Sequence, residues 1–263
     1  MKKLRFACHL ITWGGEQNQN PEKVISEVAA AGYEGIEGLP IKSADQLVEM
    51  ATLTAKYNLH IVNASGPSPE ESINYNITLG NNASEVPACG RNNFGGPDPT
   101  IEDFRRAGES LKNIIAYAHE HHIKPFHHAH LWTMIETVED AEKMLTAAPG
   151  LYLLFDTGHL TGAGSNAMRV FDKLSDRIAH VHLKDFTAND PKTWNHRKNK
   201  WGEEGRFEEL GKGNMGFDVK GILKGLIDIG YDGWVSVEQD QPTHHTPAET
   251  AKVNMEYLRS LIS

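Results

Sequence analysis

Short apolar runs alternate with amphipathic stretches along most of the chain. A run of Val, Ile, Leu or Phe between turn residues predicts a strand, whereas apolar residues that recur every three or four positions predict a helix. The predicted strands are Leu4–Trp13, Gly35–Gly38, His60–Ala64, Ile123–His128, Leu151–Asp156, Ile178–Asp185 and Trp234–Glu238, with Phe207–Gly211 as a short eighth candidate. The predicted helices are Pro21–Gly32, Ala44–Tyr57, Ile101–His122, Val138–Ala147, Asn166–Leu174, Val219–Ile229 and Ala248–Leu261.

Strands that alternate with helices in this way predict a parallel sheet whose strands are joined by crossover helices. Eight such units in about 250 residues have the size of a (β/α)8 TIM barrel. An open doubly wound sheet is the alternative, but it usually carries a GxGxxG turn after its first strand. This chain has Thr12-Trp13-Gly14-Gly15 at that point. We therefore predict a single TIM-barrel domain over residues 1–263.

Two long segments, residues 65–100 and 186–216, interrupt the alternation. The first is rich in Gly, Pro and Asn, and the second carries Trp194, Trp201 and the basic run RKNK. Long loops without structure of their own are usually functional or else disordered. Both segments follow predicted strands and so belong to the rim where barrel enzymes keep their active sites. We interpret them as lids or disordered loops.

Composition excludes several classes of protein. The chain has 26 Lys+Arg against 35 Asp+Glu, a net charge of −9, which argues against nucleic-acid binding. Apolar runs fall short of the roughly 20 residues that a membrane-spanning helix needs. Arg5 and His9 interrupt the first apolar run, so a secretion signal is not expected. Two cysteines in unrelated contexts support neither a disulfide framework nor a Cys-based zinc site, and a cytoplasmic location is expected.

Ionisable side chains collect where the predicted strands end, in a chain with 14 histidines. Asp156, His182 and Glu238 lie at or near the ends of three strands, and a fourth strand is followed by His130 and Glu136. In a parallel barrel these ends meet at one rim. Burying such groups costs several kcal/mol unless they are paired or bind a cation. The pattern therefore predicts a metal site.

One ligand from each strand gives Glu136, Asp156, His182 and Glu238. Three carboxylates and one imidazole carry a charge of about −3, and their donor set suits Mn²⁺, Co²⁺ or Mg²⁺, with Zn²⁺ as a further candidate. Glu136 lies beyond its strand, so His128 or His130 can take its place.

Each side chain also has a purely structural alternative. Asp156 can cap the following helix, His182 can be a hydrogen-bonded core histidine, and Glu238 can form a buried ion pair. Lys184 either faces a substrate hydroxyl or enolate, or pairs with Glu238 or Asp185.

Three motifs resemble those of a known family. The segments LLFDTGHLTGAG, IAHVHLKDF and LGKGNMGFDVKGILKGLIDIGYDGWVSVEQD resemble the sugar-phosphate isomerase/epimerase superfamily of xylose-isomerase-like barrels, which also contains endonuclease-IV-like enzymes. These motifs are most similar to those of the inosose dehydratase and inosose isomerase branch. The resemblance covers most of the chain from about residue 120 onward, and GYEGIE at residues 32–37 matches an early family strand.

The resemblance implies a metal held at Glu136, Asp156, His182 and Glu238, and the oxygen-rich donor set makes Mn²⁺ the first choice. It also places His159 near the substrate, and Trp13 and Glu37 on the pocket wall. Together with the strand-end argument, this gives the expected substrate contacts Trp13, Glu37, His128, His130, His159 and Lys184.

These residues predict an isomerase or epimerase of a sugar or keto-sugar that works through a metal-stabilised enediolate. Glu136 and Glu238 are the expected proton carriers, on opposite faces of the substrate. An inosose-type dehydratase on the same site is the alternative, and a carbohydrate-binding barrel without turnover also stays open. An endonuclease-IV-like phosphodiesterase is disfavoured by the acidic charge. The expected partner is a small carbohydrate, without nucleic acid or membrane, and a homo-oligomer is left open.

Overall fold

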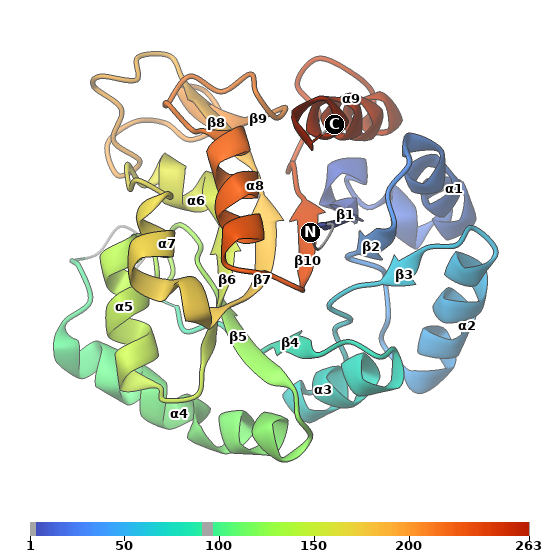
Figure 1. Ribbon diagram of the computed structural model, residues 1–263, viewed down its shortest axis with the longest axis horizontal. Helices are drawn as coiled ribbons and strands as arrows, with labels where there is room; N and C mark the ends of the chain where they lie inside the picture. The colour runs from blue at the N-terminus through green and yellow to red at the C-terminus, as the bar shows by residue number, and fades with distance from the viewer. Residues whose placement is uncertain (1–3, 91–96, 263) are drawn as a thin grey trace.

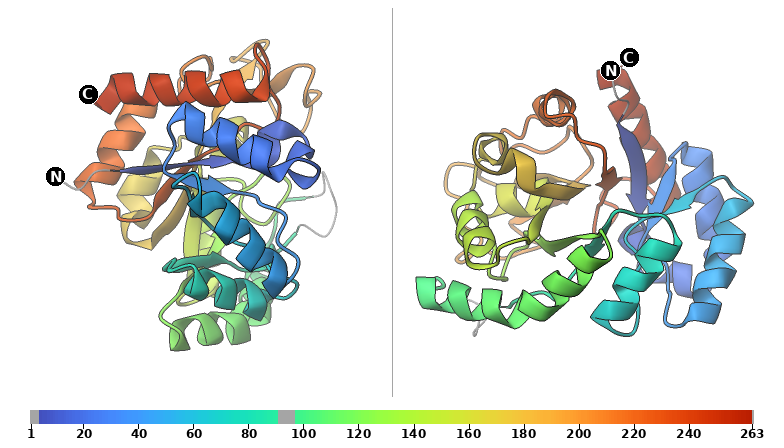
Figure 2. Two further views of the ribbon diagram at one scale, coloured as in Figure 1. Left: turned by 90° about the vertical axis from the view of Figure 1, so that its right-hand side faces the viewer. Right: turned by 60° about the horizontal axis from the view of Figure 1, so that its bottom comes forward.

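The computed structural model describes residues 4–90 and 97–262. Eight parallel strands form one curled sheet in the order β3-β2-β1-β10-β7-β6-β5-β4, and helices surround it (Figures 1 and 2). This architecture confirms the predicted TIM barrel. The strands are β1 (Arg5–His9), β2 (Gly35–Glu37), β3 (His60–Ile61), β4 (Ala83–Glu85), β5 (Lys124–His128), β6 (Tyr152–Asp156), β7 (Ile178–Leu183) and β10 (Trp234–Val237).

The helices follow the predicted amphipathic stretches, with two additions, α3 and α6. They are α1 (Pro21–Ala31), α2 (Ala44–Ala55), α3 (Pro69–Thr78), α4 (Ile101–Glu120), α5 (Val138–Ala147), α6 (Thr157–Gly162), α7 (Arg169–Leu174), α8 (Val219–Asp228) and α9 (Pro247–Ile262). Local signals explain their ends. Thr100 and Asp103 form a capping box at the start of α4, and Gly32 ends α1 in the left-handed conformation that glycine tolerates best.

The eighth strand is not where the sequence pattern suggested. It is β4, a three-residue strand inside the segment 65–100, and it pairs in parallel with β5. The predicted candidate Phe207–Gly211 is wrong as a barrel strand. Phe207 belongs to β9 (Gly205–Glu208), which pairs antiparallel with β8 (Asp185–Ala188) in a separate two-stranded sheet. Three residues are too few to show a hydrophobic period, so β4 leaves no clear sequence signal.

Asparagine side chains bridge β3 and β4, whose backbones form no ladder within the described residues. Asn81 Nδ2 donates to the carbonyl of Ile61 at 3.1 Å, and the amide of Glu85 donates to Asn63 Oδ1 at 3.2 Å. These bonds satisfy backbone groups that the short strands cannot pair. Asn63 and Asn81 therefore help to close the barrel.

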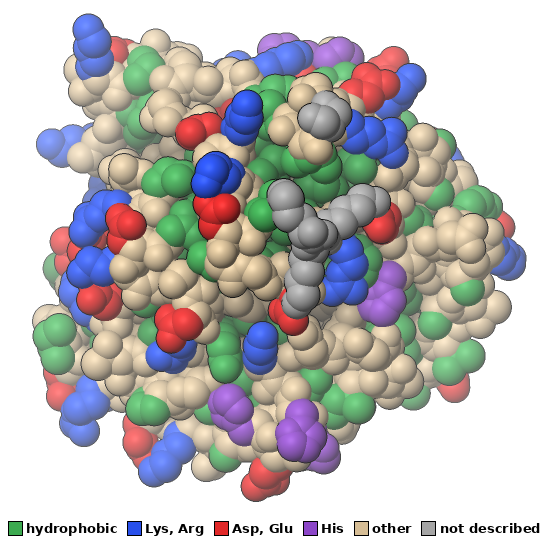
Figure 3. All heavy atoms as spheres, in the orientation of Figure 1, with side chains coloured by type: hydrophobic (Ala, Val, Ile, Leu, Met, Phe, Trp, Pro, Cys, Tyr) green, Lys and Arg blue, Asp and Glu red, His purple; other side chains and the backbone are tan. Residues whose placement is uncertain are grey.

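Both long segments contain regular structure where they are described. Residues 65–90 include α3 and β4, and residues 186–216 include most of β8 and all of β9. In the left view of Figure 2, both termini lie on the side where β1 begins, opposite the carboxyl ends of the strands. On the face drawn in Figure 3, basic and acidic side chains are interspersed. Across residues 4–90 and 97–262, the helices are too short or too polar to cross a membrane.

Candidate active site

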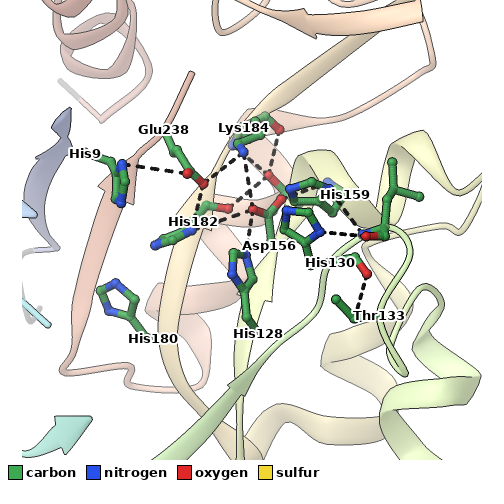
Figure 4. A network of polar contacts seen from close by, with 12 residues as sticks. His9, His128, His130, Thr133, Asp156, His159, His180, His182, Lys184 and Glu238 are labelled. Carbon is green, nitrogen blue, oxygen red and sulfur yellow. Dashed lines mark hydrogen bonds and ion pairs between the residues drawn. The ribbon is translucent and has the colours of Figure 1, made fainter. Parts of the chain in front are cut away.

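Four side chains converge at the carboxyl ends of β5, β6, β7 and β10 (Figure 4). They are His128, Asp156, His182 and Glu238, and each offers a ligand atom within 4.8 Å of the others. Asp156, His182 and Glu238 are buried, and the side chain of His128 is 17% exposed. We call these four residues the metal group.

Only part of the metal group is satisfied by internal hydrogen bonds. His128 Nε2 and Asp156 Oδ2 form a hydrogen bond at 3.2 Å, and His182 Nδ1 lies 2.8 Å from Glu238 Oε2. Nevertheless, His182 Nδ1 and Glu238 Oε2 are both buried without an acceptable hydrogen bond in the described structure. Buried polar atoms of this kind are rare and costly unless something else binds them. A cation between them would satisfy both, so the group fits a metal ion.

The donor set is two imidazole nitrogens and two carboxylate oxygens. Burial lowers the pKa of His128 to about 4, which keeps it neutral as a ligand must be. Burial also opposes ionisation of Glu238, but Lys184 and His182 outweigh it and hold the pKa of Glu238 well below its usual range. Burial disfavours the charged form of His182, but Glu238 and Glu37 outweigh it and raise the pKa of His182 well above its usual range. A divalent ion that displaces this proton would meet a group with a charge of about −2, which it would neutralise. Mixed imidazole and carboxylate ligation suits Mn²⁺, Co²⁺ or Zn²⁺ better than Mg²⁺.

Glu136, the expected fourth ligand, lies elsewhere in the structure. Its Oε1 accepts the amide hydrogen of Trp132 at 2.7 Å, and its Oε2 lies 2.8 Å from Arg197 and 3.2 Å from His196. The chain turns at Trp132, where φ is 65°, and carries Glu136 toward residues 186–216. Among the described residues it therefore falls outside the metal group. His128, the alternative that the sequence left open, stands in its place.

Glu37 was expected on the pocket wall, but the structure places it behind His182. Its Oε1 lies 3.3 Å from His182 Nε2 and 2.8 Å from Asn63 Nδ2, and its Oε2 lies 3.0 Å from His180 Nε2. Burial opposes its ionisation, yet His180 and His182 outweigh it and lower the pKa of Glu37 well below its usual range. Such a carboxylate fixes the tautomer and orientation of a ligating imidazole. Here it directs Nδ1 of His182 toward the metal group.

We expect Glu37→Gln to weaken metal binding by about 10–100-fold, the usual effect of losing a carboxylate that supports a ligating histidine. Equilibrium dialysis against Mn²⁺ or Zn²⁺ measures this. Glu34→Gln, an exposed position just before β2, is the control and should keep the wild-type affinity. An unchanged affinity in folded Glu37→Gln, checked by circular dichroism, would show that Glu37 does not position His182.

Lys184 supplies a fixed positive charge beside the metal group. It is buried, and its Nζ lies 2.9 Å from Glu238 Oε2, 2.8 Å from Asp240 Oδ1 and 3.8 Å from Asp156 Oδ2. Burial acts to lower the pKa of Lys184, but these carboxylates outweigh it and raise the pKa. The ammonium also lies 4.0 Å from the ring centroid of Phe207. Lys184 is therefore charged and held in place. Both sequence-based alternatives, pairing with Glu238 and facing a substrate, remain compatible with this position.

The rings of His130 and His159 lie next to the metal group, with centroids 3.6 Å apart and planes tilted by 35°. His130 Nδ1 lies 2.7 Å from the carbonyl oxygen of Leu131, which can only accept, so Nδ1 carries the hydrogen. His159 Nδ1 accepts the amide hydrogen of Leu131 at 3.3 Å, so a neutral His159 carries its hydrogen on Nε2. Burial lowers the pKa of His159 well below its usual range and keeps it neutral. One loop residue thus gives the two imidazoles opposite tautomers.

Asp156 combines the two roles that the sequence presented as alternatives. Its Oδ1 accepts the amide hydrogen of His159 at 2.8 Å and caps α6, while its Oδ2 faces His128 in the metal group. Because a carboxylate has two oxygens, capping and ligation do not exclude each other. The cap also fixes the carboxylate plane for the metal group.

Trp13 was expected to contact the substrate. The structure shows it largely buried at the end of a 3₁₀ turn (Leu10–Trp13) that follows β1. Its indole nitrogen donates to Glu27 on α1 at 2.7 Å, and its ring belongs to the main apolar core. These contacts anchor α1 to the rim.

Two residues near the metal group were not among the expected site residues. His9 ends β1, and its Nδ1 lies 3.7 Å from Glu238 Oε1. Glu85 ends β4, and its Oε1 lies 3.9 Å from His128 Nδ1. Burial raises the pKa of Glu85 to about 7. The expectation that site residues lie at the ends of strands could have identified His9. It could not have found Glu85, because β4 itself was not recognised.

Residues 186–216 contribute an aromatic cluster beside the site. The rings of Trp194 and Phe207 lie close to Phe186, and His159 meets Phe207 edge to face at 4.8 Å between centroids. Arg197, from the basic run, joins Glu136 to Asp98. This segment is therefore packed against the site. The cluster consists of Phe186, Ala188, Phe207, Trp194, Trp201 and Met215.

The family model described as the xylose isomerase-like TIM barrel matches residues 25–261. The chain belongs to this family and is an enzyme of its superfamily, which confirms the resemblance noted in the sequence. An inosose dehydratase from Mesomycoplasma hyopneumoniae is 30% identical over 271 residues, covering 92% of this chain and 89% of that protein. An inosose dehydratase from Clostridium perfringens is 28% identical over 265 residues, covering 90% and 89%.

Solved structures show the same fold at lower identity. The probable 3-DHS dehydratase AsbF from Bacillus anthracis has a TM-score of 0.71 at 17% identity, covering 97% of this chain and 99% of that one. An L-ribulose 3-epimerase has a TM-score of 0.71 at 14% identity, covering 99% and 95%. The IOLI protein, solved with a zinc atom, has a TM-score of 0.70 at 16% identity, covering 99% and 98%.

Proposed function

We propose that this protein is a metal-dependent dehydratase that removes water from an inosose-like substrate, a cyclic polyol with one ketone. The observation that carries the proposal is the pair of opposite tautomers at His130 and His159 beside the metal group. The relatives named inosose dehydratase, which match over about nine tenths of both chains, support the same reaction class.

The residues that would hold the ion are His128, Asp156, His182 and Glu238, and the unsatisfied atoms of His182 and Glu238 fit that role. When bound, a divalent ion supplies Lewis-acid stabilisation of the negative charge that develops on a ketone oxygen. Mn²⁺, Co²⁺ and Zn²⁺ all fit the donor set. Manganese, expected from the sequence, remains our first choice because half of the donors are carboxylates.

Elimination of water needs a base for the carbon-bound proton and an acid for the departing hydroxyl. In neutral His130 the hydrogen is on Nδ1, so Nε2 can take the proton from the carbon next to the ketone. His159 presents an Nε2–H and can donate to the hydroxyl on the following carbon. As that C–H bond and that C–O bond break, a C=C bond forms and the hydroxyl departs as water. The ammonium of Lys184 can stabilise the oxygen that becomes negative on the way.

Epimerisation or isomerisation, the main expectation from the sequence, begins with the same proton removal. It was expected to use Glu136 and Glu238 as proton carriers on opposite faces. Because Glu136 contacts His196 and Arg197, this pair is not assembled among the described residues. The arrangement therefore favours dehydration over epimerisation.

The test is to incubate the Mn²⁺-loaded protein with inososes in deuterated water and to follow the products by NMR and ultraviolet absorbance. We expect an unsaturated or diketone product that is two hydrogens and one oxygen poorer than the substrate. An epimer or isomer with deuterium at the α-carbon, formed without loss of water, would contradict the proposal and support an isomerase or epimerase. The chelated protein is the control, and activity that survives chelation would exclude the metal-dependent reaction.

A further inference from the structure

Glu85 lies at the same rim as the metal group, but its carboxyl group is not part of it. Its Oε2 is held loosely by Asn63 Nδ2 at 3.5 Å, and its Oε1 is 3.9 Å from His128 Nδ1, beyond hydrogen-bond distance. Its side chain is 35% exposed, whereas those of Asp156, His182 and Glu238 are at most 6% exposed. Within the described part of the chain, His128 is its sole ion-pair contact. The carboxyl oxygens of Glu85 can therefore accept further hydrogen bonds from a molecule bound at the rim.

A cavity of about 290 Å³ has Glu85 among its lining residues. It lies between the loop that follows β3, the first turn of α3 and residues 86–88, so it opens on the same rim as the metal group. Its volume is near the lower end of the range for small-molecule sites, about 300–1,000 Å³. Its main lining residues are Ser65, Gly66, Ser68, Ser72, Glu85 and Pro87.

The hydroxyls of Ser68 and Ser72, near the N-terminus of α3, already take part in hydrogen bonds. Ser68 Oγ accepts the amide hydrogen of Glu71, and Ser72 Oγ accepts that of Gly66 while donating to the carbonyl of Ser68. These bonds fix the shape of the loop. Among the residues that line the cavity, Glu85 is the one acid, and its carboxyl oxygens can accept hydrogen bonds from hydroxyl donors.

We propose that this cavity is the subsite for the hydroxyl-bearing part of a polyol ring, and that Glu85 accepts hydrogen bonds from hydroxyls remote from the reacting carbons. The proposal rests on the polyol substrate class of the proposed function. A carboxyl acceptor binds hydroxyls, and it disfavours an analogue that lacks them because the acceptor is left unpaired. Glu85 would thus select for polyhydroxylated substrates.

Glu85 has one competing role, the positioning of His128. Glu37 supports His182 in that way, but at 3.3 Å with hydrogen-bond geometry, whereas Glu85 is 3.9 Å from His128. A supporting carboxylate influences metal affinity, by about 10–100-fold. A subsite residue influences polyol affinity and leaves metal affinity intact. The two roles therefore differ in what can be measured.

The experiment uses the full-length, Mn²⁺-loaded protein with Glu85→Ala, Glu85→Gln and the control Glu70→Gln, an exposed carboxylate in the first turn of α3. Isothermal titration calorimetry with an unreactive inositol reports on the subsite, and equilibrium dialysis reports on Mn²⁺ affinity. We expect Glu85→Ala to weaken inositol binding about 10-fold or more, Glu85→Gln to weaken it less, and Glu70→Gln to have no effect. Mn²⁺ affinity should stay within about threefold of wild type.

Three results would overturn the proposal. They are wild-type inositol affinity in Glu85→Ala, no inositol binding to the wild-type protein, and a 10-fold or larger loss of Mn²⁺ affinity with inositol binding preserved. The last result would make Glu85 a positioning residue for His128. The assays also separate this inference from the dehydratase proposal. Inositol binding that depends on Glu85 without dehydration of inososes contradicts only the dehydratase, whereas dehydration without such dependence contradicts only the subsite.

Discussion

His128→Ala is expected to lose the divalent ion, whereas Glu136→Gln is expected to keep it. His128 offers Nε2 to the metal group, and Glu136 instead contacts Arg197 and His196. Losing a direct ligand should weaken metal binding by more than about 100-fold, beyond the 10–100-fold typical of a supporting residue. Metal content after gel filtration, together with equilibrium dialysis, measures the difference. Dehydration by His128→Ala should fall to the level of the chelated protein.

The pair of variants decides between the ligand set expected from the sequence, which includes Glu136, and the metal group, which contains His128 instead. Glu136→Gln weakens the interaction of residue 136 with Arg197, so the melting temperature of this variant should fall. The metal content of the variant should stay at the wild-type level. The opposite pattern, metal lost in Glu136→Gln and kept in His128→Ala, would restore Glu136 as a ligand. It would also remove the argument that disfavours epimerisation.

Lys184→Met should abolish most of the activity without losing the metal. The ammonium lies 2.9 Å from Glu238 and 2.8 Å from Asp240, so it is fixed where a developing negative charge would need it. Removing a group that stabilises charge or transfers a proton typically costs about 100- to 10,000-fold in rate. Metal affinity should be unchanged or tighter, because the ammonium competes for Glu238. Turnover and dialysis on the same preparation measure both quantities.

Lys212→Met provides a matched control for this variant. Lys212 also pairs with a buried glutamate, Glu209, at 2.7 Å, but the pair lies outside the metal group. Its activity should therefore stay close to wild type. If Lys184→Met kept wild-type turnover, or lost its metal together with its activity, Lys184 would have a structural role and not one in the reaction.

The fold was largely predictable because most of its elements are long enough to carry a period. Helices such as Val138–Ala147 and strands such as Tyr152–Asp156 coincide with their predicted ranges or differ by one residue. The elements that the sequence did not predict are short. A three-residue strand, Ala83–Glu85, joins its neighbour across the barrel opening through asparagine side chains, and such contacts do not produce a hydrophobic pattern.

The candidate site was predictable where a ligand is the last residue of its strand or lies within it. Asp156 and His182 follow that rule, and Glu238 comes directly after β10. Glu136 did not follow it, because it lies eight positions beyond the end of β5, with seven loop residues between. The direction of a loop depends on turns such as the one at Trp132, which depend in turn on tertiary packing.

The sequence alone determined the parallel barrel and placed three members of the metal group at one rim, because strand periodicity fixes which residues reach the carboxyl ends. Only the tertiary structure chose His128 over Glu136, set the tautomers of His130 and His159 through Leu131, and brought Glu85 to the rim. These choices depend on distances between segments remote in sequence. A one-dimensional pattern carries residue types and spacing along the chain, but it does not carry those distances.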